Sequence, residues 1–141
     1  MGDIEYNLSI KTNKKRKGEM KMKKSEMRKL VKKEMTIMKA RKELQKITRH
    51  IDNRQIYVRC YTSQGMDCSL ITDLMVEVQD LDELEWYGFS IASIEVPCET
   101  RIEGWEFMEM TQDIFKTMKK NMIAELEKYG YENIDTEDYN C

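Results

Sequence analysis

Two neighbouring segments in the middle of the chain alternate apolar and polar residues and are joined by a turn sequence. Residues 55–62 read QIYVRCYT, rich in β-branched and aromatic side chains, and a turn containing Gly65 follows. One face of the next segment carries Leu70, Leu74, Val76 and Val78, with Thr72 in register. Period-two alternation on both sides of a glycine turn is typical of a β-hairpin. This part of the chain is therefore constrained to an antiparallel sheet with one buried face.

A third strand is predicted at residues 86–96, WYGFSIASIEV, after an acidic loop at 79–85. Pro97 ends this strand because proline cannot donate a hydrogen bond to a neighbouring strand. Residues 101–110, RIEGWEFMEM, alternate weakly and indicate a further strand.

The N-terminal residues also alternate. Residues 3–11 place Ile4, Tyr6, Leu8 and Ile10 on one face, which predicts a strand. Alternation returns at Met20 and Met22 after the polar residues 12–18, so we expect a hairpin with a basic tip and Gly18 in its turn. A continuous helix from about Glu19 fits the same apolar residues and stays open as the alternative.

From Ser25 onward the apolar period becomes that of a helix. Leu30, Ile37, Leu44 and Ile51 recur every seven residues. Ser25 is a suitable N-cap and Asp52 a suitable end, which predicts a helix of about 26 residues, roughly 39 Å long.

A second helix is predicted after Thr111, its expected N-cap. Its apolar residues recur at helical spacing up to Tyr129, and Gly130 follows as a C-capping glycine. Residues 131–141 are polar and acidic and are interpreted as a short extension or tail. The predicted fold is a single α+β domain over residues 1–141, an antiparallel sheet of four to six strands packed by two amphipathic helices.

The net charge of -2 hides an opposition between the two ends of the chain. Residues 1–54 hold 18 Lys and Arg against 7 Asp and Glu, a balance of +11, whereas residues 55–141 hold 6 against 19, a balance of -13. Such an asymmetry indicates an electrostatic partner, or two partners of opposite sign. A basic face that meets the acidic half of a second copy in a homodimer is a further interpretation.

The basic N-terminal segment supplies the candidate binding residues. It has enough cationic side chains to neutralise several phosphates of DNA or RNA without reading sequence. The candidates for contact with a partner or a nucleic acid are Lys14, Lys15, Arg16, Lys17, Lys21, Lys23, Lys24, Arg28, Lys29, Lys32 and Lys33.

Aromatic residues of the predicted sheet offer a second kind of contact. The set comprises Tyr57, Tyr61, Trp86, Tyr87, Phe89, Trp105 and Phe107. They could stack bases as an RNA-binding sheet does, but the acidic charge of this half repels phosphate. Packing in a core or an interface is the better interpretation.

The sequence offers little for catalysis or metal binding. Four cysteines without a close pair, Cys60, Cys68, Cys98 and Cys141, predict reduced thiols in the cytoplasm, although a hairpin would bring Cys60 and Cys68 towards each other. The single histidine, His50, completes no zinc motif, and no phosphate-binding loop occurs. The apolar runs are far shorter than a membrane span requires. We therefore expect no cofactor, no metal, no membrane contact and no enzymatic activity.

A small, methionine-rich, highly charged chain with opposed basic and acidic halves resembles the accessory proteins of phages and mobile elements. Among them it is similar to anti-CRISPR proteins, which disable RNA-guided nucleases. The likeness covers the whole chain in size, charge layout and architecture, and it carries over no diagnostic motif or functional residue. It implies a non-enzymatic inhibitor that binds a host nucleoprotein complex through protein contacts and charge complementarity.

Two alternatives remain at this stage. The first is a DNA- or RNA-binding regulator that uses the basic N-terminal segment. The second is a small metal-dependent nuclease, although the sequence assembles no catalytic group for it.

Overall fold

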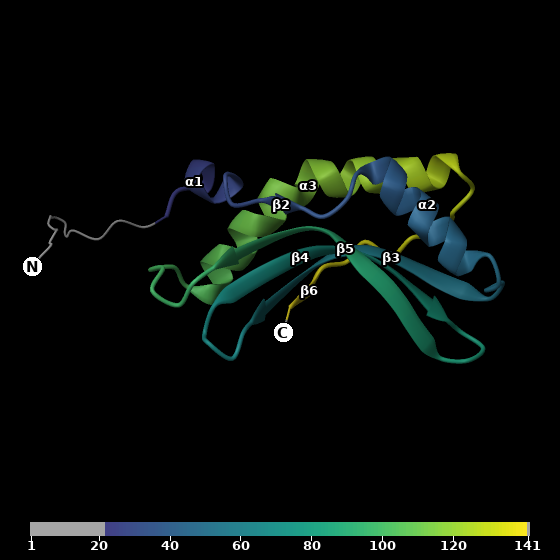
Figure 1. The fold of residues 1–141 in the computed structure, drawn as a ribbon, viewed down its shortest axis with the longest axis horizontal. Helices are drawn as coiled ribbons and strands as arrows, with labels where there is room; N and C mark the ends of the chain where they lie inside the picture. Colours follow the sequence, from purple (N-terminus) through teal and green to yellow (C-terminus); the bar gives the residue numbers. More distant parts are fainter. Residues whose placement is uncertain (1–21, 141) are drawn as a thin grey trace, which may run out of the picture.

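The computed structural model describes residues 22–140, in which helices cover one face of a five-stranded sheet (Figure 1). The strands are β2 (Lys32–Lys33), β3 (Arg54–Gln64), β4 (Leu70–Asp80), β5 (Glu85–Val96) and β6 (Tyr139–Asn140), and the helices are α1 (Lys24–Arg28), α2 (Ile37–Thr48) and α3 (Gly104–Lys128). The strand order is β2-β5-β4-β3-β6, antiparallel except where β6 joins β3. The α+β class is confirmed. The predicted strand at 3–11 and the basic hairpin tip lie outside the described residues.

The three long strands form where the alternation predicts them. β3 pairs with β4 over its whole length, so that Val58 lies opposite Val76 and Cys60 opposite Leu74. These four side chains are at most 1 % exposed, whereas the residues between them are only half-buried. One face of the sheet therefore faces the core, and the other faces away from the helices.

The long helix predicted from Ser25 is wrong. The chain instead forms the short α1, extends through β2 to pair with β5, and starts α2 after its N-cap Thr36, whose hydroxyl accepts a hydrogen bond from the Lys39 amide at 3.1 Å. The break supplies hydrogen bonds to an edge of β5 that a continuous helix would leave unpaired. It also lets Met27 enter the core, while Leu30, expected on the apolar stripe, is 41 % exposed.

The predicted strand at 101–110 is also wrong, because α3 already begins at Gly104. The apolar residues that looked alternating belong to a helical stripe in which Phe107, Thr111 and Phe115 are fully buried. Thr111 is therefore not an N-cap. Gly130, with φ of +92°, does end this helix as predicted, since its amide and that of Tyr131 bond back to the last turn.

The C-terminal residues expected as an extension or tail run along the outer edge of β3. The Asp135 amide and carbonyl bond to Ile56 and Val58, and β6 pairs in parallel with β3 beyond that point. Lys119 of α3 holds this segment by an ion pair of 2.7 Å to Asp138. The segment covers an edge that would otherwise expose unpaired backbone groups.

Two cysteines of the described chain are joined. A disulfide links Cys68, in the turn between β3 and β4, to Cys98 in the loop after β5, with their Cα atoms 5.0 Å apart. The prediction of reduced thiols is therefore wrong for this pair. Cys60, the other partner considered for Cys68, is a buried free thiol on β3.

The disulfide is expected to stabilise the fold. Replacing Cys98 with Ser (C98S) removes a cross-link that closes a loop with a sequence separation of 30 residues, and should lower the free energy of unfolding by about 2–4 kcal/mol. Urea denaturation of the wild type and C98S, each with and without a reductant, measures the difference. Reductant should shift only the wild type, and equal midpoints for the oxidised wild type and C98S would contradict this expectation.

Candidate binding surface

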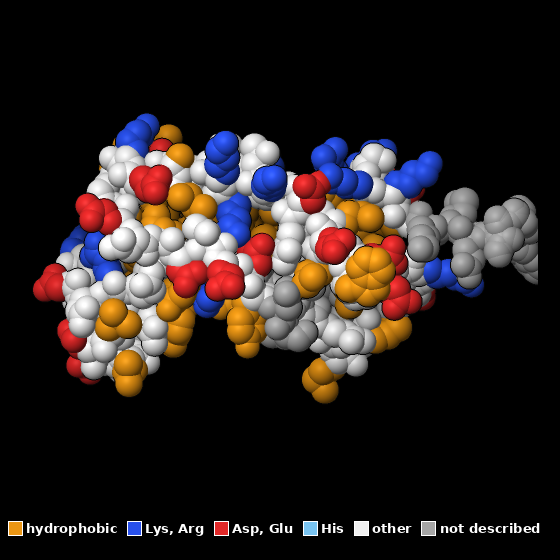
Figure 2. Space-filling model, turned by 180° about the vertical axis from the view of Figure 1, so that it is seen from behind, with side chains coloured by type: hydrophobic (Ala, Val, Ile, Leu, Met, Phe, Trp, Pro, Cys, Tyr) orange, Lys and Arg blue, Asp and Glu red, His pale blue; other side chains and the backbone are white. Residues whose placement is uncertain are grey.

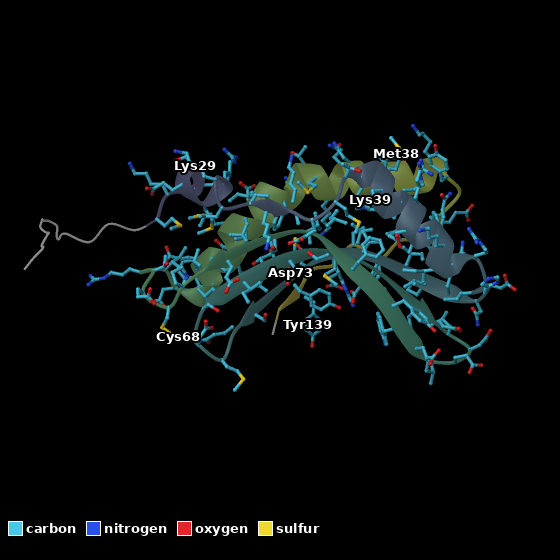
Figure 3. The ribbon with its side chains drawn as sticks, in the orientation of Figure 1. Lys29, Met38, Lys39, Cys68, Asp73 and Tyr139 are labelled. Carbon is cyan, nitrogen blue, oxygen red and sulfur yellow. A yellow bond between two sulfur atoms is a disulfide. The ribbon has the colours of Figure 1, made fainter. Side chains whose placement is uncertain are left out.

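All three helices lie on one side of the sheet, so the opposite side of β3, β4 and β5 is left uncovered by any helix (Figure 1). We call this surface the open face. It is formed by Tyr57, Arg59, Tyr61, Asp73, Met75, Glu77, Trp86 and Tyr139. Figure 3 shows Asp73 and Tyr139 on this side, whereas Lys29 and Lys39 lie on the helix side.

A single guanidinium occupies the centre of the aromatic part of the open face. The Cζ atom of Arg59 lies 4.2 Å from the ring centroid of Tyr57, 5.0 Å from that of Tyr61, and 5.9 Å from those of Trp86 and Tyr139. Tyr57 packs on Trp86, and Tyr61 on Tyr139, with centroids 5.0 and 5.2 Å apart. Cation–π attraction and ring contacts therefore hold four aromatic rings around one charge.

Polar contacts fix the orientation of this guanidinium. Arg59 donates from Nε to the Glu77 carboxylate at 3.3 Å and from Nη2 to the Tyr61 hydroxyl at 2.6 Å. Gly88, opposite Glu77 on β5, provides the necessary space, because a Cβ there would lie 2.8 Å from Glu77 Cγ. The Arg59 and Glu77 side chains are only 14 % and 15 % exposed, so this pair is substantially desolvated.

The same contacts set the ionisation of the cluster. Burial alone would lower the pKa of Arg59, but Tyr61 and Glu77 raise it overall. Burial and then the hydrogen bond and charge of Glu77 raise the pKa of Tyr61. The cluster is therefore a charged guanidinium beside a neutral phenol.

Part of the cluster remains open to solvent. Trp86 is 48 % exposed and Tyr139 49 %, although each touches the buried Arg59 assembly on one side. A few aromatic and arginine side chains usually contribute most of the binding energy of a protein interface. The exposed rings of Trp86 and Tyr139, supported by Arg59, are side chains of this kind.

A half-buried carboxylate lies further along the open face. Asp73 accepts a hydrogen bond from the Ser90 hydroxyl at 3.3 Å and forms no ion pair with any described residue. Burial, opposed by the Ser90 hydrogen bond and supported by the charges of Glu34 and Glu95, raises its pKa. Asp73 therefore lies near two further carboxylates, while Lys32, at the β2 edge of the same face, adds one positive charge.

Most of the predicted basic candidates lie elsewhere; the exception is Lys32 of β2, which pairs with Ser93, itself opposite Asp73, and therefore lies at the edge of the open face. Lys14, Lys15, Arg16, Lys17 and Lys21 fall outside the described residues, and the remaining six cluster around α1 and β2 at one end of the molecule: Lys23, Lys24, Arg28, Lys29, Lys32 and Lys33. All of these except Lys24 are exposed, and Lys24 forms an ion pair with Asp113 of α3. Viewed from behind in Figure 2, Lys and Arg side chains gather along the helix side.

The structure divides the aromatic residues that the sequence grouped together. Tyr57, Tyr61 and Trp86 meet on the open face. Phe107 and Trp105 both belong to α3, where Phe107 is buried and Trp105 is exposed. Arg59 was not among the residues expected from the sequence to form a site, although its outward position between two tyrosines on β3 was a usable signal. Nothing in the sequence indicated Tyr139, which only the return of the C-terminus brings to the cluster.

Two features of the described residues bear on metal-dependent and thiol chemistry. No three His, Cys, Asp or Glu residues among them are placed to hold a metal ion. Burial, reinforced by Asp138, raises the pKa of Cys60 to about 12, so this thiol is protonated and a poor nucleophile. The metal-dependent nuclease interpretation gains no support from this part of the chain.

Comparison with known proteins found no matching family model, no similar curated protein and no similar solved structure. Within residues 22–140, no helix has both the length and the apolar character needed to cross a membrane.

The raised pKa of Asp73 predicts how the stability of the fold depends on pH. This pKa is raised above the ordinary value of 3.8 in the folded protein, so the ionised carboxylate destabilises the fold at neutral pH, and protonation relieves this as the pH falls towards 3.8. Asp73→Asn, which can still accept from Ser90, should therefore unfold at a higher temperature than the wild type at neutral pH. Calorimetry over a pH series measures the difference, which should shrink in acid. A constant or inverted difference would mean that the carboxylate is not destabilised by its surroundings.

Proposed function

We propose that the protein is a non-enzymatic binding protein that inhibits a host nucleic-acid-handling defence complex, as anti-CRISPR proteins do. The target is a nucleoprotein complex such as an RNA-guided nuclease. Binding takes place through the open face, with the exposed rings of Trp86 and Tyr139 as the central contacts.

The observation that carries this proposal is the Arg59 cluster. Four aromatic rings and an arginine are held in place on a sheet face that no helix covers, with two of the rings half exposed. A rigid cluster loses little conformational entropy on binding, so more of its contact energy appears as affinity.

Charge complementarity supports the same assignment. Asp73 with its acidic neighbours Glu34 and Glu95 flanks the aromatic cluster on the sheet, which suits a target surface with basic groups. The basic side chains around α1 supply charge of the opposite sign at a separate place. A complex that contains both protein and nucleic acid offers partners for both charges.

A nucleic-acid-binding regulator remains the second candidate, favoured by the exposed basic side chains around α1 and β2. Lys23, Arg28 and Lys29 form no ion pair with any described residue, and they continue the basic sequence that begins at Lys14. Such a surface would bind phosphate backbones without reading sequence.

A tryptophan pair tests the assignment of the open face. The tagged full-length protein, Trp86→Ala and Trp105→Ala are each used to capture RNA-guided nuclease complexes from the host, and affinity for the captured complex is measured by biolayer interferometry. Loss of a central interface ring should weaken binding by about 2 kcal/mol or more. Trp105→Ala removes a ring from α3 that is 60 % exposed, against 48 % for Trp86, and should bind normally. Unchanged binding of Trp86→Ala would contradict the role of the open face, provided that circular dichroism shows both variants folded.

A salt titration separates the two candidates. If the protein is primarily an inhibitor that binds protein, its affinity for bare duplex DNA or single-stranded RNA in gel shifts should be weak at physiological salt. A nucleic-acid regulator should instead bind tightly at low salt, with the logarithm of the affinity falling steeply as salt rises. Neutralising Lys23, Arg28 and Lys29 should reduce that slope by about one unit per lost phosphate contact if the regulator interpretation holds.

A further inference from the structure

A groove on the helix side of the molecule is separate from the open face. It lies between α3, the start of α2 and the edge of β5, and its volume is about 610 Å³. Pockets that bind small molecules usually range from about 300 to 1,000 Å³. The lining residues are Lys33, Met35, Thr36, Ile37, Ile91, Ile114, Thr117, Met118 and Asn121.

The groove exists because the chain leaves the sheet after β2. The amides of Glu34 and Met35 both approach the Ile91 carbonyl, at 3.0 and 3.4 Å, so pairing with β5 stops there. The chain then turns towards Thr36, the N-cap of α2. In Figure 1 the segment between β2 and α2 runs beside α3 above β5. Backbone hydrogen bonds and a helix cap thus define the groove wall, so the site is largely formed before any ligand arrives.

The chemistry of the lining is asymmetric. Most of the wall is aliphatic or thioether, from residues such as Ile91, Ile114 and Met118. Its polar residues are two threonines, one asparagine and Lys33, and no acidic residue lines it. Lys33 is exposed and forms no ion pair with any described residue. The groove therefore combines an apolar wall with a single positive charge that lacks a counter-ion in this part of the chain.

We propose that this groove binds an amphipathic carboxylate, a molecule with a saturated hydrocarbon chain and a terminal anionic group. The chain lies along the isoleucine and methionine side chains, whose burial drives binding, and the carboxylate contacts the Lys33 ammonium and the adjacent polar groups. This site is independent of the proposed inhibitory function, and it gives Lys33 a different role from the nucleic-acid or partner contact that the sequence suggested.

Two adjacent lysines provide a matched pair for the test. Lys32 lies opposite Ser93 and Lys33 opposite Ala92, so their side chains leave the strand on opposite faces. Only Lys33 lines the groove. Lys33→Gln and Lys32→Gln therefore change net charge equally at neighbouring positions and differ in their access to the groove.

The experiment is isothermal titration calorimetry of the full-length protein with dodecanoate below its micelle concentration, and with dodecanol as the uncharged analogue. The wild type and Lys32→Gln should bind dodecanoate with equal affinity. Lys33→Gln should bind it about tenfold more weakly, equivalent to about 1.4 kcal/mol. Thr117→Trp places a large side chain at an exposed lining position and should abolish binding while leaving the circular dichroism spectrum unchanged.

Several results would overturn the proposal. Equal loss of affinity in the two lysine variants would show a general charge effect, and dodecanol binding as tightly as dodecanoate would remove the role of the anionic group. Absence of saturable dodecanoate binding would also overturn it. If, in addition, Thr117→Trp lost capture of the host complex, the groove would belong to the protein target instead. Because Trp86 does not line the groove, failure here leaves the test of the open face unaffected.

Discussion

The structure depends on the burial of one face of β3, β4 and β5 beneath α3. The largest fully buried side chains come from both sides of this contact, with Leu74 and Val76 on the sheet and Phe107 and Phe115 on the helix. A chain of hydroxyls crosses the same interface, from Thr62 to Thr72 at 2.9 Å and from Thr72 to Thr111 at 2.8 Å. Because Thr111 also donates to the Phe107 carbonyl, the buried hydroxyls are satisfied and fix the helix against the strands.

Because all the helices of the described residues cover one face of the sheet, the side chains of the other face can pack only against one another (Figure 1). Its outward residues cannot enter the core, so they contact one another across the strands, and Arg59 gathers the rings of Tyr57, Tyr61 and Trp86. The C-terminal segment adds Tyr139 from β6 after α3 has returned the chain to the edge of β3. The candidate binding surface is thus a consequence of which face is buried.

The molecule has two surfaces of different chemistry on opposite sides. The open face presents aromatic rings with acidic neighbours, and the helix side presents basic residues around α1 and the apolar groove beside Lys33. The basic and acidic residues of the two halves of the sequence are therefore only partly separated onto different surfaces. Some of them form internal ion pairs, as where Arg41 of α2 meets Glu125 of α3 at 3.1 Å and Lys24 meets Asp113.

The sequence by itself determined the three long strands, the later part of α3 and its glycine cap, because alternation, helical spacing and turn residues act locally. It could not place the break near Lys32, since that depends on the unpaired edge of β5, a strand some sixty residues further along the chain. It could not show that RIEGWEFMEM is helical, because the helical conformation of this segment depends on the packing of Phe107 and Thr111 against the sheet. The aromatic residues of β3 and β5 were visible in the sequence, but only tertiary structure brought Arg59, Trp86 and Tyr139 together and formed the groove, because strand register and helix packing join residues far apart in the chain.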